Sequence, residues 1–331
     1  MRAATEIARF DADVQRARDA ARPLARQRVP SHEWPFVFFH LRKAGGSTVR
    51  RALDDAAKAA KVDSFVACQG GVSCTTWGPS TDHHDGKGPD VIGGHFFAPL
   101  VDRWASQRWS TGRHAAFLAN ATTTNAPACF VLLRQTVPRV KSCWNYRFIQ
   151  TMGQSLRHKL PGVRSFGNTS AAEIGRTLPR ARSNYDEGCN NEAARVLSYH
   201  GFDEELLGRL TAGSESSATA TAVVAEVLKR LSSCVVGILE RCADTETVLR
   251  AYLPWLAPHY ACENTTLNRG TVEDRKDAVV DADVEDVVLR QNALDEVAYK
   301  FGDEMLTLRL AQGQSYLAAH GATAHKKGRS A

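Results

Sequence analysis

The stretch over residues 36–53, FVFFHLRKAGGSTVRRAL, constrains the fold more than any other part of the sequence. Its aromatic and β-branched start, residues 36–39, is typical of a short buried strand, and residues 48–60 have the apolar periodicity of an amphipathic helix. Between them lie Gly45 and Gly46, which allow backbone conformations and close approaches that a Cβ atom would prevent. The pattern therefore predicts a strand, a tight turn and a helix.

The predicted turn has the properties of an anion-binding site. The first amides of a helix have no acceptor within the helix, and the helix dipole adds a positive potential there. We expect the amides of Gly46, Ser47 and Thr48 to face a bound phosphate or sulfate. Lys43 would add a mobile point charge beside them. The alternative is an ordinary strand-to-helix turn capped by Ser47. The Walker loop, G-x-x-x-x-G-K-[ST], is excluded because the lysine here precedes the glycines.

The composition of the chain is that of a globular protein with ample material for a core. Its 331 residues are 43% hydrophobic and 24% charged. The net charge of +6 favours small anionic ligands or acidic polymers. No basic patch interleaved with aromatic residues is present, so we expect no nucleic-acid partner.

The cysteines and glycosylation sequons indicate an oxidising, secretory compartment. No C-x-x-C spacing occurs, which argues against a zinc ribbon or a thioredoxin-like motif. Sequons stand at Asn120, Asn168 and Asn264. The pairing of the cysteines stays open at this stage. The eight cysteines are Cys68, Cys74, Cys129, Cys143, Cys189, Cys234, Cys242 and Cys262.

The two ends of the chain differ from its middle. Residues 1–33 are rich in Ala and Arg, and the helical spacing of Ile7, Phe10 and Val14 predicts a frayed or stem-like helix. Residues 1–30 contain no apolar stretch long enough for a signal peptide or a membrane span, so either the natural N-terminus is missing or the protein is not luminal. Residues 313–331 are expected to form a disordered tail.

A second apolar run ends in a histidine. Residues 89–100, PDVIGGHFFAPL, predict a short strand followed by His95. Open α/β sheets bind ligands at this end of their strands. The alternative is a structural histidine packed against Phe96 and Phe97. A nearby cluster, residues 82–85 (DHHD), lies in a polar loop without the regular spacing of metal ligands, so we expect a solvated loop and no metal site.

A third run repeats the order of strand, basic residue and helix. Residues 128–149, ACFVLLRQTVPRVKSCWNYRFI, predict a buried strand, then Arg134, then a helix that begins at Pro138. The guanidinium of Arg134 and the hydroxyl of Ser142 could grip one anion. Alternatively, Arg134 forms a surface ion pair and Ser142 lies on the back of the helix. A further strand over 234–239 and a long helix over 284–308 complete an order that predicts an α/β fold with a parallel sheet flanked by helices.

In this order the motifs resemble those of the carbohydrate (glycosaminoglycan-type) sulfotransferases that use 3′-phosphoadenosine 5′-phosphosulfate (PAPS). The family's 5′-phosphosulfate loop is similar to FFHLRKAGGSTV, and its 3′-phosphate motif to FVLLRQTVPRVKSCWNY. The segment that carries a catalytic histidine in the uronyl 2-O-sulfotransferase branch resembles IGGHFF. Weaker similarity extends the resemblance over residues 34–310, and it implies a single sulfotransferase domain, with a P-loop-like sheet, over residues 34–312.

The resemblance also implies an activity. A sulfuryl group would pass from PAPS to a hydroxyl of a glycan acceptor, with Lys43 and His95 as catalytic residues and no metal. By similarity to the family, a loop at Asn268 and Arg269 would cover the nucleotide. The family consists of type II membrane proteins of the Golgi lumen, although no anchor is visible in this chain. The residues implied to bind PAPS are Lys43, Ala44, Gly45, Gly46, Ser47, Thr48, Arg134, Ser142, Asn268 and Arg269.

The match to the 3′-phosphate motif has departures. Gln135 stands where the family has Asp or Asn, and Thr136 where it has Pro, with the chain's own Pro138 two residues later. Arg139 and Ser142 nevertheless keep the family's spacing from Arg134. Two other functions fit the sequence: a P-loop-type kinase, and a non-catalytic protein that binds anionic glycans.

Overall fold

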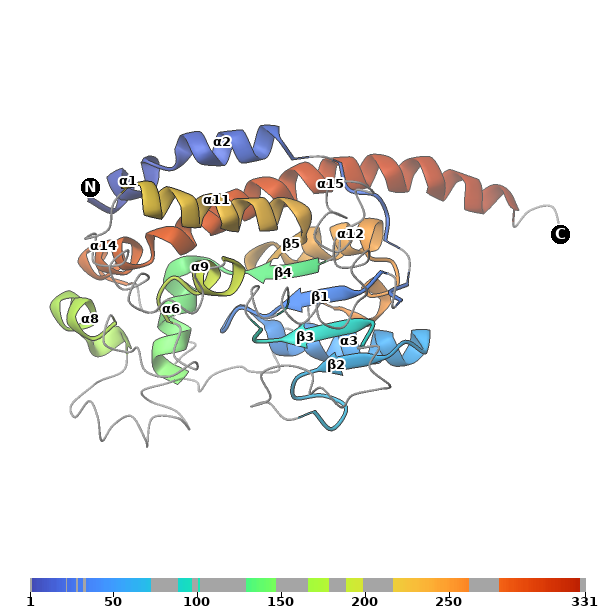
Figure 1. The fold of residues 1–331 in the computed structure, drawn as a ribbon, viewed down its shortest axis with the longest axis horizontal. Helices are drawn as coiled ribbons and strands as arrows, with labels where there is room; N and C mark the ends of the chain where they lie inside the picture. Colours follow the sequence, from blue (N-terminus) through green and yellow to red (C-terminus); the bar gives the residue numbers. More distant parts are fainter. Residues whose placement is uncertain are drawn as a thin grey trace.

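The computed structural model of the chain, shown in Figure 1, describes residues 2–21, 23–27, 29–31, 34–72, 89–96, 101, 129–146, 166–178, 189–198, 217–261 and 280–327. At its centre lies a five-stranded sheet whose strand pairs are all parallel. The order across the sheet is β2-β3-β1-β4-β5. The strands are β1 (Phe36–Phe39), β2 (Ser64–Val66), β3 (Val91–Gly94), β4 (Cys129–Leu133) and β5 (Val235–Ile238).

The strands are short apolar runs because both faces of the sheet are covered. Every residue of β1, β3, β4 and β5 is buried, as expected for parallel strands with helices on both faces. Helix α3 (Gly46–Ala60) packs on β2 and β3, whereas α12 (Cys242–Tyr252) and α15 (Ala293–Lys327) pack on β5. The prediction of an α/β fold with a parallel sheet flanked by helices is confirmed, and the architecture is compatible with a P-loop-like fold.

Strand β1 occupies the middle of the sheet and sets the position of the site. In the register, Phe39 lies opposite Gly94 of β3 on one side and Val131 of β4 on the other. The chain leaves β1 toward β2 and β3, and later returns to the opposite side through β4 and β5. The carboxyl ends of β3, β1 and β4 therefore lie side by side at one edge of the sheet. The order in which strands are added changes direction at β1, and α/β proteins bind ligands at such a point.

The remaining helices build the rest of the domain. Helix α6 begins at Thr136, two residues before the predicted start, so Pro138 lies in its first turn, where a missing N–H is tolerated. These helices are α1 (Arg2–Ala8), α2 (Asp11–Asp19), α6 (Thr136–Trp144), α8 (Ala171–Thr177), α9 (Glu192–Leu197), α11 (Ser217–Ser233) and α14 (Ala282–Gln291), with short 3₁₀ turns η2 (Phe166–Asn168), η4 (Leu239–Arg241) and η5 (Ala257–His259).

The N-terminal segment is helical, as its spacing predicts, but it does not stand apart as a frayed stem. Helix α1 contacts α14 and α15, and α2 contacts α11 and α15 (Figure 1). Ile7 and Phe10 are buried in the main core. A thin apolar stripe is therefore enough to attach this segment, because two large side chains supply the buried area.

The C-terminal region differs from the prediction in two ways. The expected helix over 284–308 is divided at Asn292 into α14 and α15. Helix α15 then continues to Lys327, through most of the tail that we expected to be disordered from residue 313. Leu317 packs against the main core, and a Cβ atom at Gly313 would lie 2.9 Å from Ala251, which explains why the helix does not end at residue 312.

Disulfides join elements that are distant in the sequence. Cys129 of β4 pairs with Cys234 beside β5, and Cys143 of α6 pairs with Cys189 before α9. Cys68 is disulfide-bonded as well, and so is Cys242, each to a partner outside the two pairs just named. These bonds indicate an oxidising secretory or extracellular compartment.

One sequon lies in the described part of the chain. The side chain of Asn168 is exposed at the end of η2, whereas Asn120 and Asn264 lie outside the described residues. Within the described ranges, none of the helices combines the length and the hydropathy that a bilayer crossing requires.

Candidate anion-binding site

The turn between β1 and α3 has the backbone geometry of an anion-binding loop. Lys43 has a φ of 64° and Gly45 a φ of 82°, both in the left-handed region. Helix α3 begins immediately afterwards at Gly46, with no side chain capping it. Alternation of right- and left-handed residues directs successive amides toward a common centre. Gly45 is the N-cap residue of the helix, so the turn is not capped by Ser47 as the alternative interpretation had it.

The members of the predicted loop do not all face the same way. Ala44 and Thr48 are buried, whereas Lys43, Gly45 and Ser47 are partly exposed. The Thr48 amide donates to the carbonyl of Gly45 at 3.2 Å. That amide closes the first turn internally, which leaves the more exposed front of the loop to Lys43, Gly45 and Ser47.

Position 46 needs a residue without a Cβ atom because of His40, which the sequence analysis did not identify as a site residue. A Cβ atom at this position would lie 1.9 Å from Cδ2 of His40 and 2.0 Å from its Nε2. The imidazole of His40 therefore fills the space beside the first residue of α3. His40 is 4% exposed, and burial, followed by the nearby His95 and Arg50, lowers its pKa well below 6.5. The only sequence signal was a polar residue directly after four apolar ones.

His95 lies beside the loop, in contact with the same histidine. Its ring stacks on that of His40 with centroids 3.8 Å apart, and its Nδ1 lies 3.0 Å from the His40 carbonyl oxygen. Because a carbonyl only accepts hydrogen bonds, Nδ1 carries the proton and Nε2 is left as an acceptor. Burial, followed by the charges of Arg42 and Arg50, lowers the pKa of His95 well below 6.5. A neutral imidazole with an acceptor nitrogen can take a proton from a hydroxyl.

Lys43 extends toward a tyrosine from a neighbouring element. Its Nζ lies 4.2 Å from the ring centroid of Tyr146, which follows α6 and is 41% exposed. This is the geometry of a cation–π interaction. The ring keeps the ammonium at the front of the loop.

Arg134 contacts the loop directly. Its Nη1 donates to the carbonyl oxygen of Lys43 at 3.0 Å, and its Nε lies 3.8 Å from Glu240. Glu240 also accepts from the amide of Gln135 at 3.3 Å. Arg134 therefore holds the backbone of the loop in its left-handed turn and is partly balanced by a carboxylate. No hydrogen bond among the described residues joins Ser142 of α6 to Arg134 or to the loop.

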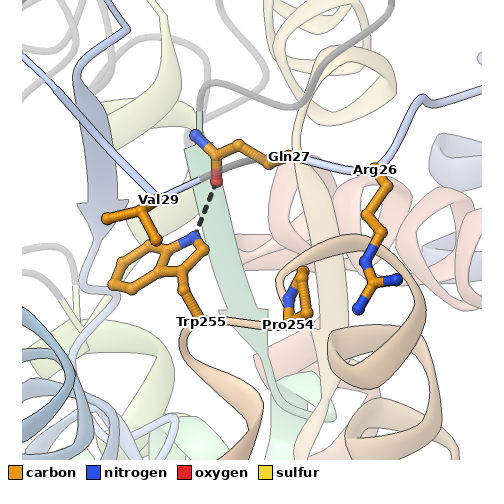
Figure 2. Close-up of a pocket in the computed structure, with 5 residues that line it drawn as sticks. All are labelled: Arg26, Gln27, Val29, Pro254 and Trp255. Atoms are coloured by element: carbon orange, nitrogen blue, oxygen red, sulfur yellow. Dashed lines mark hydrogen bonds between the residues drawn. The ribbon is translucent and has the colours of Figure 1, made fainter. Parts of the chain in front are cut away.

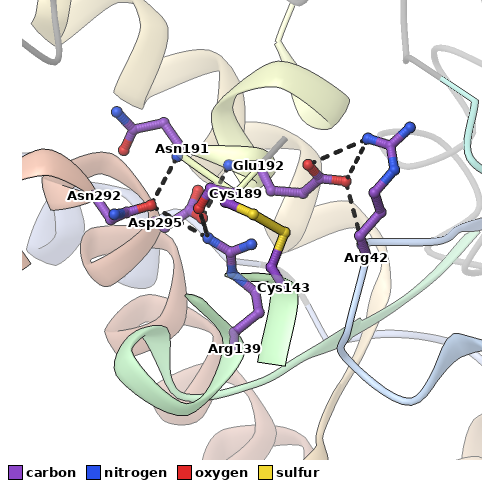
Figure 3. The surroundings of a disulfide bond; sticks show 8 residues. All are labelled: Arg42, Arg139, Cys143, Cys189, Asn191, Glu192, Asn292 and Asp295. Carbon is purple, nitrogen blue, oxygen red and sulfur yellow. Dashed lines mark hydrogen bonds and ion pairs between the residues drawn. A yellow bond between two sulfur atoms is a disulfide. The ribbon is translucent and has the colours of Figure 1, made fainter. Parts of the chain in front are cut away.

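Arg139, the other arginine of the second motif, is part of a buried frame (Figure 3). It is 2% exposed and donates to Asp295 at 2.7 Å, to the Cys189 carbonyl at 2.8 Å and to Asn292 at 3.3 Å. Asp295 also accepts from the amides of Glu192 and Ala193, at 2.9 and 2.7 Å. The frame thus ties α6, α9 and α15 together beside the Cys143–Cys189 disulfide. All three hydrogen bonds of Arg139 use Nη2, and its Nη1 is buried without a partner among the described residues.

The frame reaches the loop through one carboxylate. Glu192 accepts from the amide of Arg42 at 3.2 Å and from its Nη1 at 3.3 Å (Figure 3). The side chain of Glu192 is only 1% exposed. Arg42, directly before Lys43, is therefore fixed by helix α9. Sequence spacing gave no sign of this contact, because 150 residues separate the two partners.

A pocket lies elsewhere on the domain. It has a volume of about 560 Å³ and is lined by Arg26, Gln27, Val29, Pro254 and Trp255 (Figure 2). The indole of Trp255 packs edge-on against Phe36, the first residue of β1. The pocket is thus at the end of β1 opposite the loop.

Two predicted site residues and one candidate cluster lie outside the described residues: Asn268, Arg269 and residues 82–85. Across the described part of the chain, no three His, Cys, Asp or Glu side chains are grouped to hold a metal ion. Comparison of the chain with protein-family models, with curated proteins and with solved structures gives no significant match in any of the three.

Proposed function

We propose that this protein is an O-sulfotransferase that moves a sulfuryl group from PAPS to a hydroxyl of a glycan. The observation that carries the proposal is that two groups, a cation and a base, lie at the same turn between β1 and α3. Lys43 supplies a cation at the loop's front, and His95 supplies a neutral imidazole whose Nε2 is an acceptor. Transfer to a hydroxyl needs both an anion site and a base beside it.

In the proposed reaction the acceptor oxygen attacks sulfur while the bond between sulfur and the 5′-phosphate oxygen breaks. The hydroxyl proton passes to Nε2 of His95, and the electron pair leaves with the phosphate, giving adenosine 3′,5′-bisphosphate. Lys43 and the loop amides stabilise the negative charge that grows on this leaving group, as in phosphoryl transfer. Because burial keeps the pKa of His95 low, the base stays neutral at mildly acidic pH.

The proposed nucleotide position uses β4 as well as β1. Arg134 already donates to the Lys43 carbonyl, so the same guanidinium can link the loop to a phosphate at the 3′ side. The proposal gives Arg139 no part in binding, because its charge is paired with Asp295 in the buried frame.

The first experiment measures nucleotide binding by calorimetry, comparing adenosine 3′,5′-bisphosphate with ATP and Mg²⁺, followed by transfer from labelled PAPS to a panel of glycans. We expect binding of the bisphosphate and transfer to at least one glycan. Lys43→Ala should lower kcat by about 100-fold or more, since charge-stabilising groups in transfer sites contribute this much. The control is Lys229→Ala, on an exposed position of α11, which should leave kcat unchanged.

Three results would overturn the proposal. Tight binding of ATP with Mg²⁺ and none of the bisphosphate would favour a kinase. Glycan binding without any nucleotide binding would favour a non-catalytic binder. Full turnover in Lys43→Ala would remove the proposed role of the loop.

A further inference from the structure

The four arginines around the loop differ in how their charges are balanced. Arg42 pairs with Glu192, Arg134 lies 3.8 Å from Glu240, and Arg139 pairs with Asp295. The fourth, Arg50 on the second turn of α3, has no carboxylate partner among the described residues. It is nevertheless 7% exposed.

The hydrogen bonds of Arg50 are also poor. Its Nη1 donates to Sγ of Cys68 at 2.9 Å, and its Nη2 to Oγ of Ser47 at 3.4 Å. Its Nε is buried and has no hydrogen-bond acceptor among the residues that the structure describes. A disulfide sulfur is a weak acceptor, and the contact to Ser47 is long. Within the described part of the chain, a guanidinium with five donors is thus left with two marginal partners.

Such an arrangement is costly unless something else balances the charge. A buried ion without a counter-ion is destabilising, and native proteins pair or hydrogen-bond their buried charges. Arg309, on α15, also lacks a carboxylate in the described structure and also has an unpartnered Nε, but it donates to two oxygens, of Gln312 and Ser232. Arg50 has no comparable acceptor in the described structure, so its surroundings suit an incoming anion.

The position of Arg50 points into the site. Ser47 follows β1, and Cys68 follows β2, so the guanidinium bridges the carboxyl ends of these two strands. Between them in the sheet lies β3, and His95 directly follows β3. Arg50 therefore lies across the carboxyl end of β3, which is followed by the proposed base His95. This is the side of the loop away from Arg134.

We propose that Arg50 binds a substrate oxyanion beside His95, in a subsite separate from the phosphate held by the loop amides. The inference rests on the proposed transfer reaction. The oxyanion has one of two sources: the sulfuryl group of the donor, or an acidic group of the acceptor, a carboxylate or an existing sulfate, next to the hydroxyl that reacts. A guanidinium binds each of these with paired hydrogen bonds.

The experiment compares Arg50→Gln with Arg51→Gln, a matched control because Arg51 is the exposed neighbour on the same helix. Inorganic sulfate and sodium glucuronate are each titrated by calorimetry at constant ionic strength, with and without saturating adenosine 3′,5′-bisphosphate. In the Arg50 variant we expect a loss of about 10- to 100-fold in affinity for one of these probes, as for a charged hydrogen-bonded contact. Affinity for the bisphosphate should change by less than about threefold.

The two probes identify the source. Loss of sulfate binding alone, in the presence of the bisphosphate, assigns Arg50 to the donor's sulfuryl group. Loss of glucuronate binding assigns it to an acidic acceptor. A second variant, Arg50→Met, tests the uncompensated charge directly: its melting temperature without ligand should equal or exceed that of the parent protein.

Several outcomes would overturn the inference. One is unchanged affinity for both probes in Arg50→Gln. Another is an equal loss for the bisphosphate, which would place Arg50 at the loop phosphate. A large fall in the melting temperature of Arg50→Met would show a structural role. Failure of the unaltered protein to bind the bisphosphate would count against the proposed function. The role of Arg50 would then be decided by the binding of sulfate and glucuronate measured without nucleotide.

Discussion

The two strand–turn–helix units, β1–α3 and β4–α6, contain similar residues that serve different purposes. Each has a buried apolar strand followed by arginine or lysine and a helix. In the first unit the turn contains two left-handed residues, and Arg50 has no carboxylate partner in the described structure. In the second unit Arg139 is buried in a network with Asp295, and a disulfide fastens the helix.

The difference shows how the role of a buried arginine can be inferred from the groups around it. Where a carboxylate and carbonyls surround an arginine, as at Arg139, the charge holds elements together. Where a buried arginine faces a sulfur and a hydroxyl at 3.4 Å, with no carboxylate among the described residues, as at Arg50, we infer that a ligand balances the charge. Sequence similarity to a binding motif does not separate these cases, because both arginines stand in motifs of similar form.

The largest expected effect comes from breaking the frame of the second unit. Asp295→Asn should reduce the free energy of unfolding by about 3–5 kcal/mol, because it leaves the buried charge of Arg139 uncompensated. Chemical denaturation, followed by circular dichroism, measures the change.

The control for this variant is Glu304→Gln, which removes an exposed ion pair with Arg18 at 3.5 Å. It should cost less than about 1 kcal/mol. An equally small cost for Asp295→Asn would contradict the contrast between the two units.

An intermediate effect is expected in the first unit. Gly46→Ala should cost about 1–3 kcal/mol in stability, because the added methyl group overlaps the ring of His40. The double variant with His40→Ala removes this overlap, so it should be more stable than the sum of the single changes predicts.

The same pair of variants separates packing from binding. If Gly46 also serves close approach of a phosphate, the double variant regains stability but binds adenosine 3′,5′-bisphosphate weakly. A double variant that recovers neither stability nor binding would show that His40 is not the obstacle.

The sequence predicts what depends on neighbours in the chain. The apolar runs of β1, β3, β4 and β5, the turn at Lys43 and the position of His95 follow from local pattern. Strand β2 is only three residues long and gives no such signal. Contacts such as Arg42 with Glu192 or Arg139 with Asp295 join positions more than 100 residues apart, and a single sequence carries no information on which carboxylate meets which arginine.

The ends of the chain show a similar limit. The weak apolar stripe of the N-terminal segment predicted a frayed helix, yet Phe10 is 1% exposed. The outcome depends on the surface that α11, α14 and α15 offer, which local periodicity does not contain. The continuation of α15 past residue 312 has the same cause, since Leu317 finds a core to pack on.

The smallest effect tests a contact that crosses between the two units. Lys43 belongs to the first, and Tyr146, against whose ring its ammonium lies, follows the helix of the second. Tyr146→Leu should reduce affinity for adenosine 3′,5′-bisphosphate by about two- to fivefold, because an exposed cation–π contact contributes about 0.5–1 kcal/mol and its loss frees a flexible side chain. Tyr146→Phe keeps the ring and should bind as the parent protein does. Since Tyr146 is 41% exposed, both variants should melt at the parent temperature. Equal loss in both variants would assign the effect to the tyrosine hydroxyl, and the link between the two units would then rest on Arg134 and the Lys43 carbonyl alone.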